Sequence, residues 1–105
     1  MSIPQITAEE AKMKLEAKAA DFFDIRDPSA YAAGHIPGAK PLNDETIAEF
    51  LKTADKNRPL VINCYRGNAS QGATAYLLEQ GFKEVYSLAG GFEGWRTTGP
   101  IEQSN

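Results

Sequence analysis

The sequence predicts an α/β fold in which helices cover a parallel β-sheet. Short apolar runs alternate along the chain with segments whose apolar residues recur at helical spacing, a pattern typical of parallel sheets with right-handed crossovers. Residues 60–62 are apolar, partly β-branched and preceded by a proline, which predicts a fully buried strand. The following segment, 70–80, contains no proline and precedes Gly81. It is therefore predicted to be a helix closed by a C-terminal glycine.

The first quarter of the chain is predicted to contain two strands and one helix. The residues through Ile6 form a short edge strand. Thr7 and Glu10 have the spacing of a capping box, in which each side chain bonds the backbone N–H group of the other residue. The helix that they begin extends to about Ala19. Residues 21–26 form the second strand, and its charged end lies at the edge of the sheet where α/β proteins build their sites.

The remaining predicted elements are shorter. Their bounds are 28–32 for a helical turn, 39–42 for a strand, 83–88 for the last strand and 92–96 for the last helix. Asn43 is predicted to cap a further helix, whose apolar face contains Ile47, Phe50 and Leu51. The tail 101–105 is expected to be loose.

Composition and charge limit the possible functions. The 105 residues are expected to form one domain, 1–105, and the net charge of −3 leaves no basic patch for nucleic acid or an anionic membrane. The chain has no apolar run of membrane-spanning length and no signal-peptide pattern. One cysteine and one histidine argue against a disulfide or a multi-cysteine metal site. We therefore expect a cytoplasmic protein without a metal or other cofactor.

The only cysteine, Cys64, opens the loop between the buried strand and the helix that follows it. A loop wrapped onto a helix N-terminus points backbone N–H groups inward, and the helix dipole adds partial positive charge. This environment stabilises a thiolate, so we expect the pKa of Cys64 to lie below the free value of about 8.5. Arg66 adds a positive charge, and Gly67 permits close approach of a substrate. The loop therefore predicts a nucleophilic sulfur in an anion-binding cradle.

The loop residues also have interpretations without chemistry. Cys64 could be an inert buried thiol, although the polar loop that it opens argues against this. Arg66 either contacts the anion or lies in solvent. Tyr65 either shields the sulfur or packs against its neighbours. Asn68 and Ala69 are expected to act only through their N–H groups.

Two further sets of residues are expected to support the loop. Asp24 and Arg26 are expected to form a structural ion pair that holds the loop, rather than a catalytic pair. His35 lies in a predicted turn and is expected to bond to the backbone, because a thiolate that is already formed needs no base. Gly90 and Gly91 are expected to permit close approach to the loop.

Four stretches together resemble the rhodanese family. They are residues 24–28, 31–39, 64–69 and 90–95. The first two are similar to the first rhodanese signature, the third to the six-residue active-site loop, and the fourth to the C-terminal signature. They occur in the family order and span most of the chain. The chain length and the pattern Cys-Tyr-x-Gly-Asn most resemble the single-domain thiosulfate sulfurtransferases.

The resemblance implies a five-stranded parallel sheet with helices on both faces and sulfur transfer by double displacement. Cys64 would take the outer sulfur of thiosulfate, release sulfite, and pass the sulfur from a persulfide to cyanide or a thiol. The implied substrate-binding residues are Tyr65, Arg66, Gly67, Asn68, Ala69 and Ser70. Expected partners are thiosulfate and an acceptor such as cyanide, glutathione or a thioredoxin-like protein. The chain itself is expected to be a monomer or a weak homodimer.

The loop departs from the family pattern at its last position. Many rhodanese loops end in Arg, Thr or Ser, where this chain has Ala69. Ser70 follows and either supplies a hydroxyl or caps the helix. Two other function classes remain open. A related cysteine phosphatase or arsenate reductase would need an arginine at the position of Ser70. A sulfur carrier or regulatory module would receive sulfur at Cys64 from a protein donor.

Overall fold

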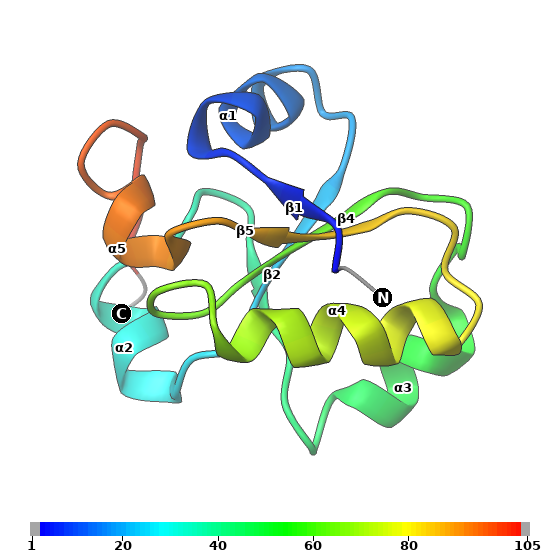
Figure 1. Cartoon of the computed structure of the whole chain (residues 1–105). Helices are drawn as coiled ribbons and strands as arrows, with labels where there is room; N and C mark the ends of the chain where they lie inside the picture. Colours follow the sequence, from blue (N-terminus) through cyan, green and yellow to red (C-terminus); the bar gives the residue numbers. More distant parts are fainter. Residues whose placement is uncertain (1–2, 104–105) are drawn as a thin grey trace.

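The computed structural model describes residues 3–103 and contains one five-stranded parallel sheet (Figure 1). The strands are β1 (Gln5–Ile6), β2 (Asp21–Asp24), β3 (Lys40–Pro41), β4 (Leu60–Asn63) and β5 (Val85–Leu88). Their order in the sheet is β1-β5-β4-β2-β3, and every pair is parallel. The predicted buried strand is therefore the central one, and the first strand is an edge strand, as predicted. Residues 1–2 of that prediction lie outside the described part of the chain.

Helices cover both faces of the sheet, which confirms the predicted architecture. They are α1 (Ala8–Glu16), α2 (Pro28–Ala33), α3 (Ile47–Thr53), α4 (Ala69–Glu79) and α5 (Gly91–Trp95). Figure 1 shows α1 on one side of the sheet and α3 and α4 on the other. Successive side chains of β4 point to opposite faces of the sheet. Val61 packs in a core cluster with Trp95, and Ile62 packs in a second cluster that contains Leu77 of α4.

Two predicted helix ends are wrong. The capping box at Thr7 begins α1 as predicted, but the helix stops at Glu16 rather than at Ala19. The chain leaves the helix because Lys18 adopts a left-handed conformation with φ of 54°. The N-cap residue of α3 is Thr46 rather than Asn43. The Asn43 side chain instead caps the turn just before α3, where it accepts hydrogen bonds from the backbone N–H groups of Glu45 and Thr46.

The predicted loose tail is held in place at Glu102. Its backbone forms an antiparallel bridge with His35, with both N–H···O distances at 2.9 Å. One carboxylate oxygen of Glu102 accepts a bond of 3.0 Å from the N–H group of Gly38 and lies 3.2 Å from Nε2 of His35. The prediction for 101–105 is therefore wrong at this residue, and residues 104–105 lie outside the described part of the chain.

Candidate active site

Cys64 lies at the carboxyl end of β4, at the start of the loop that leads into α4. In Figure 1 this loop lies at the end of the sheet where α2 and α5 also lie. The cysteine side chain is buried, with 4% of the residue exposed. The placement agrees with the rule that α/β proteins build their sites outside the carboxyl ends of parallel strands.

Three hydrogen-bonding groups surround the sulfur at contact distance. The backbone N–H of Gly67 lies 3.2 Å from Sγ of Cys64, and the backbone N–H of Ser70 lies 3.3 Å from it. The Ser70 hydroxyl oxygen also lies 3.3 Å from Sγ. Once the thiol is ionised it can only accept, so this hydroxyl then donates to the sulfur. Ser70 therefore supplies a hydroxyl to the site, one of the two roles open for it from the sequence.

These contacts change the acidity of the thiol. Burial acts to raise the pKa of Cys64, but hydrogen bonds from the Ser70 side chain and backbone, and from the backbone of Gly67 and Arg66, outweigh it. The pKa of Cys64 is therefore lowered, as the sequence predicts. The lowered pKa increases the fraction of thiolate near neutral pH, and the thiolate is the nucleophilic form.

Ser87 of β5 is a residue of this network that sequence reasoning missed. Its hydroxyl oxygen lies 2.7 Å from that of Ser70, and both serines are fully buried. When Ser87 donates to Ser70, the single hydroxyl proton of Ser70 is free to point at the sulfur. The sequence signal for Ser87 is weak: it is a serine inside an otherwise apolar strand, 23 positions after Cys64.

The start of α5 holds the loop from the other side. The backbone N–H of Phe92 donates to the Cys64 carbonyl at 2.8 Å, and that of Glu93 donates to the Tyr65 carbonyl at 3.0 Å. The N-cap residue of α5, Gly90, has no side chain to perform this role. The active loop therefore caps α5 with its own carbonyl groups, and its N–H groups remain directed toward the sulfur.

Glycines allow the loop and the turn before α5 to approach closely. A Cβ atom on Gly91 would lie 2.6 Å from backbone atoms of Tyr65 and Arg66, and one on Gly67 would lie 3.1 Å from the backbone of Leu88 and Gly90. Gly67 and Gly91 also have positive φ values of 95° and 59°. The close approach predicted from the sequence for the Gly90–Gly91 turn is confirmed.

Asp24 and Arg26 form the expected ion pair. The shortest contact, between Nη2 of Arg26 and Oδ2 of Asp24, is 2.7 Å, and both side chains are almost completely buried. The same nitrogen donates to the Gly34 carbonyl at 2.6 Å. The guanidinium carbon lies 4.0 Å from the ring centre of Phe92, the residue after the Gly90–Gly91 turn. The pair thus joins the end of β2 to α5, and within residues 3–103 none of its hydrogen bonds is to the sulfur of Cys64.

The outer part of the loop faces solvent. Arg66, Asn68 and Ala69 are exposed, and Arg66 forms no ion pair with any of residues 3–103. Tyr65 is 44% exposed, and its hydroxyl donates to a carboxylate oxygen of Asp27. This contact, with further hydrogen bonds from Ala30 and Ser29, lowers the pKa of Asp27 to about 2. Tyr65 therefore joins the loop to the segment after β2. Its hydroxyl bonds to Asp27 and not to the sulfur.

His35 bonds to the backbone, as expected. Its Nδ1 lies 2.8 Å from the Tyr31 carbonyl, so this nitrogen carries a proton and donates. The ring stacks on that of Tyr31 with 3.9 Å between centres. Among the contacts of residues 3–103, none joins His35 to Cys64.

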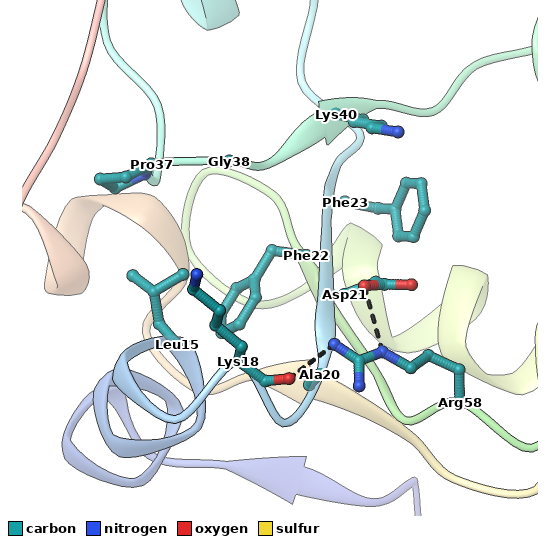
Figure 2. Close-up of a pocket in the computed structure, with 10 residues that line it drawn as sticks. All are labelled: Leu15, Lys18, Ala20, Asp21, Phe22, Phe23, Pro37, Gly38, Lys40 and Arg58. Carbon is teal, nitrogen blue, oxygen red and sulfur yellow. Dashed lines mark hydrogen bonds and ion pairs between the residues drawn. The ribbon is translucent and has the colours of Figure 1, made fainter.

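A cavity lies at the opposite ends of the strands from Cys64 (Figure 2). Its volume is about 320 Å³, and it is lined by Lys18, by Asp21 at the start of β2 and by Arg58 before β4. Arg58 is already bound there, to Asp21 at 3.2 Å and to the Lys18 carbonyl at 2.7 Å. Figure 2 shows both contacts inside the cavity. The residues that line this cavity include neither Cys64 nor any other residue of the loop 64–70.

Residues 3–103 contain neither a membrane-spanning helix nor a cluster of metal ligands. No helix there has the length and apolar character needed to cross a membrane. No three His, Cys, Asp or Glu side chains gather there in a way that could hold a metal ion.

The family assignment follows from sequence comparison as well as from this geometry. The rhodanese-like domain family matches residues 7–98, and the chain belongs to this family. Solved structures agree with the fold. The rhodanese-like domain protein of Staphylococcus aureus superposes with a TM-score of 0.83 at 32% identity, over 98% of this chain and 100% of that chain.

Within the family, the chain is similar to single-domain bacterial enzymes. It is 52% identical over 98 residues to a protein of Pseudomonas entomophila named thiosulfate sulfurtransferase GlpE, covering 93% of this chain and 89% of that one. It is 53% identical over 91 residues to the protein of the same name from Pseudomonas fluorescens, covering 87% of this chain and 84% of that one. The resemblance expected from the sequence motifs is confirmed.

Proposed function

We propose that this protein is a thiosulfate sulfurtransferase that uses Cys64 as its nucleophile and cyanide or a thiol as its acceptor. The observation that carries the proposal is the buried sulfur of Cys64 at the centre of hydrogen-bond donors from Gly67 and Ser70. The names of the similar Pseudomonas proteins support the same activity.

The donor half-reaction needs a thiolate and a place for a dianion. The thiolate of Cys64 attacks the outer sulfur of thiosulfate, and the bond between the two thiosulfate sulfurs breaks. Its electron pair leaves with sulfite, and the enzyme keeps a persulfide. The N–H groups at the start of α4 and the free charge of Arg66 are the groups proposed to hold the dianion. Tyr65, Asn68 and Ala69 are also exposed on this loop.

The acceptor half-reaction returns the enzyme to its starting state. Cyanide attacks the outer sulfur of the persulfide, the sulfur–sulfur bond breaks, and its electron pair stays on Sγ of Cys64. The products are thiocyanate and the thiolate. The same donors that lower the pKa of Cys64 stabilise the charge on the leaving sulfur. Neither step needs a general acid or base, and within residues 3–103 the ring nitrogens of His35 bond to Tyr31 and Glu102 rather than to the network.

The loop favours sulfur transfer over phosphoryl transfer. A phosphatase of this general type needs an arginine to clamp the phosphate in a bidentate manner. Ser70 stands at that position, and it is fully buried with its hydroxyl directed at the sulfur and at Ser87.

Steady-state turnover of thiosulfate and cyanide tests the proposal. Thiocyanate should form with the wild-type protein and should be absent with Cys64→Ser, whose circular dichroism and melting temperature should stay close to those of the wild type. Wild-type turnover in Cys64→Ser would refute the mechanism. A wild-type protein that accepts sulfur only from another protein would establish the carrier interpretation instead.

A further inference from the structure

An apolar groove lies on the side of the molecule that α3 and α4 cover. It consists of two hollows of about 560 Å³ and about 460 Å³ that share Ile25, Asn43 and Asp44 and are therefore continuous. The apolar lining consists of Ile25, Leu42, Ile47, Ala73 and Tyr76. Tyr76 is 44% exposed. Aromatic side chains of this kind are typical anchors of binding surfaces.

The groove adjoins the loop that carries Cys64, through a contact of Asp27. Its second hollow is lined by Asp27, whose carboxylate accepts the hydrogen bond from Tyr65, the residue next to Cys64. Its first hollow is lined by Ala73, one helical turn after Ala69 at the start of α4. A molecule that fills the groove therefore extends along α4 toward the loop that carries the sulfur.

The exposed charges of the groove are all negative. Asp27, Asp44 and Glu45 line it and are exposed. The only cation in the lining, Arg26, is committed to Asp24 and the Gly34 carbonyl and has 4% of its side chain exposed. Such a surface repels small anions and favours a cationic partner. Arg66 and Ala69, the first residue of α4, line neither hollow, so the positive part of the site is separate from this groove.

We propose that the groove binds the sulfur acceptor, which is a protein segment that combines apolar side chains with Lys or Arg beside a reactive thiol. The apolar lining would bind the side chains of the segment, and the three carboxylates would bind its cations. The size of the two hollows exceeds that of a small thiol, and the contact between Asp27 and Tyr65 places the second hollow beside the loop that carries the persulfide. This inference rests on the proposed function.

The transfer itself is balanced without a further reactant. The acceptor thiol gives its proton to the persulfide anion, and the acceptor thiolate then forms a bond to the outer sulfur. The bond between that sulfur and Sγ of Cys64 breaks, and its electron pair stays on Sγ. The acceptor leaves as a persulfide with the proton, and Cys64 is again a thiolate.

Two matched peptides test the proposal. Both are six residues long with one cysteine and two leucines, and the other three positions are lysine in one peptide and glutamate in the other. The protein is loaded with thiosulfate and desalted, and the rate at which each peptide gains sulfur is followed by mass spectrometry. At low ionic strength we expect the lysine peptide to react at least about tenfold faster per unit concentration, with a smaller ratio in high salt.

Variants that lack the carboxylate charges separate the effect of the groove on the rate ratio from the effect of the intrinsic reactivity of the peptides. In the double variant Asp44→Asn with Glu45→Gln, the ratio should fall to within about threefold. The control variant Glu9→Gln with Glu16→Gln removes the same charge from exposed positions of α1, on the other side of the sheet, and should keep the wild-type ratio. An unchanged ratio in the Asp44 and Glu45 variant would overturn the inference. Failure of thiosulfate to load the wild-type protein would instead contradict the proposed function.

Discussion

The acidity of Cys64 depends on hydroxyl groups that the chain brings together from two elements. Ser70 at the start of α4 touches the sulfur, and Ser87 of β5 touches Ser70. Each hydroxyl has one proton to donate. When the sulfur is a thiolate, Ser87 donates to Ser70 and Ser70 donates to Cys64, so both protons have an acceptor. This explains why two serines are buried beside a nucleophile, where an unpaired hydroxyl would be costly.

Removal of either hydroxyl should shift the pH dependence of thiol reactivity to higher pH. Because the pKa of Cys64 is lowered, its alkylation rate rises with pH and reaches a plateau at a lower pH than the rate of a free thiol does. Ser70→Ala should slow alkylation by iodoacetamide near pH 7 by about threefold to tenfold. Ser87→Ala should act in the same direction but less strongly. Profiles identical to that of the wild type would show that the serines serve packing alone.

Arg66 provides the free charge of the loop. Arg66→Ala should raise the KM for thiosulfate by about an order of magnitude, which corresponds to about 1.4 kcal/mol of anion binding, and should leave the alkylation of Cys64 by neutral iodoacetamide nearly unchanged. Steady-state kinetics against thiosulfate at fixed cyanide measure the effect. An unchanged KM would make Arg66 a solvated side chain without a role.

At the scale of elements, the active loop is held between the start of α4 and the start of α5. α4 begins at the sulfur, and α5 is capped by the carbonyls of Cys64 and Tyr65. The arrangement requires a backbone-to-backbone approach that only glycine allows at Gly91. Backbone contacts therefore join the two helices to the loop around Cys64.

A pair of glycine substitutions tests this arrangement. Gly91→Ala should destabilise the protein by more than about 2 kcal/mol and reduce sulfur loading, because its φ is positive and its Cβ would meet the loop backbone. Gly72→Ala, in α4 with open space around it, should raise stability by about 0.5–1 kcal/mol and preserve loading. Urea unfolding measures both. Similar effects of the two changes would contradict the proposed contact.

The sequence predicted much of this arrangement because its signals are local. A capping box, a buried strand and a cysteine before a helix are each read within about a dozen residues, and all three are present in the structure. The missed features depend on distant partners. Ser87 meets Ser70 only because β5 lies beside β4, and Glu102 meets His35 across 67 positions. Neither pairing leaves a pattern within the sequence around it.

For the whole molecule, the segment after α5 closes the fold by returning to the turn after α2. Hydrogen bonds lower the pKa of Glu102, chiefly one from the Gly38 N–H and then one from His35. A carboxylate with a lowered pKa stabilises the fold at pH values above its ordinary pKa, and this contribution is lost as the pH falls through the lowered value. The end of the described chain thus stabilises the loop that contains His35.

Glu102→Gln should therefore lower the melting temperature at pH 7, and the difference from the wild type should shrink as the pH falls below the ordinary glutamate pKa and vanish once Glu102 is protonated in the folded protein. Thermal melts across this range measure the effect. Glu79→Gln, an exposed change at the end of α4, is the matched control and should have little effect at any pH. A difference that persists undiminished at low pH would show that the charge of Glu102 is not what holds the segment.

The central claim is that Cys64 carries sulfur, and intact-mass spectrometry tests it most directly. After incubation with thiosulfate the protein should gain about 32 Da, one sulfur atom, and cyanide should remove it as thiocyanate. Because Cys64 is the only cysteine, the gain identifies the site without further mapping. No gain in mass, in folded protein whose thiol can still be titrated, would contradict the claim.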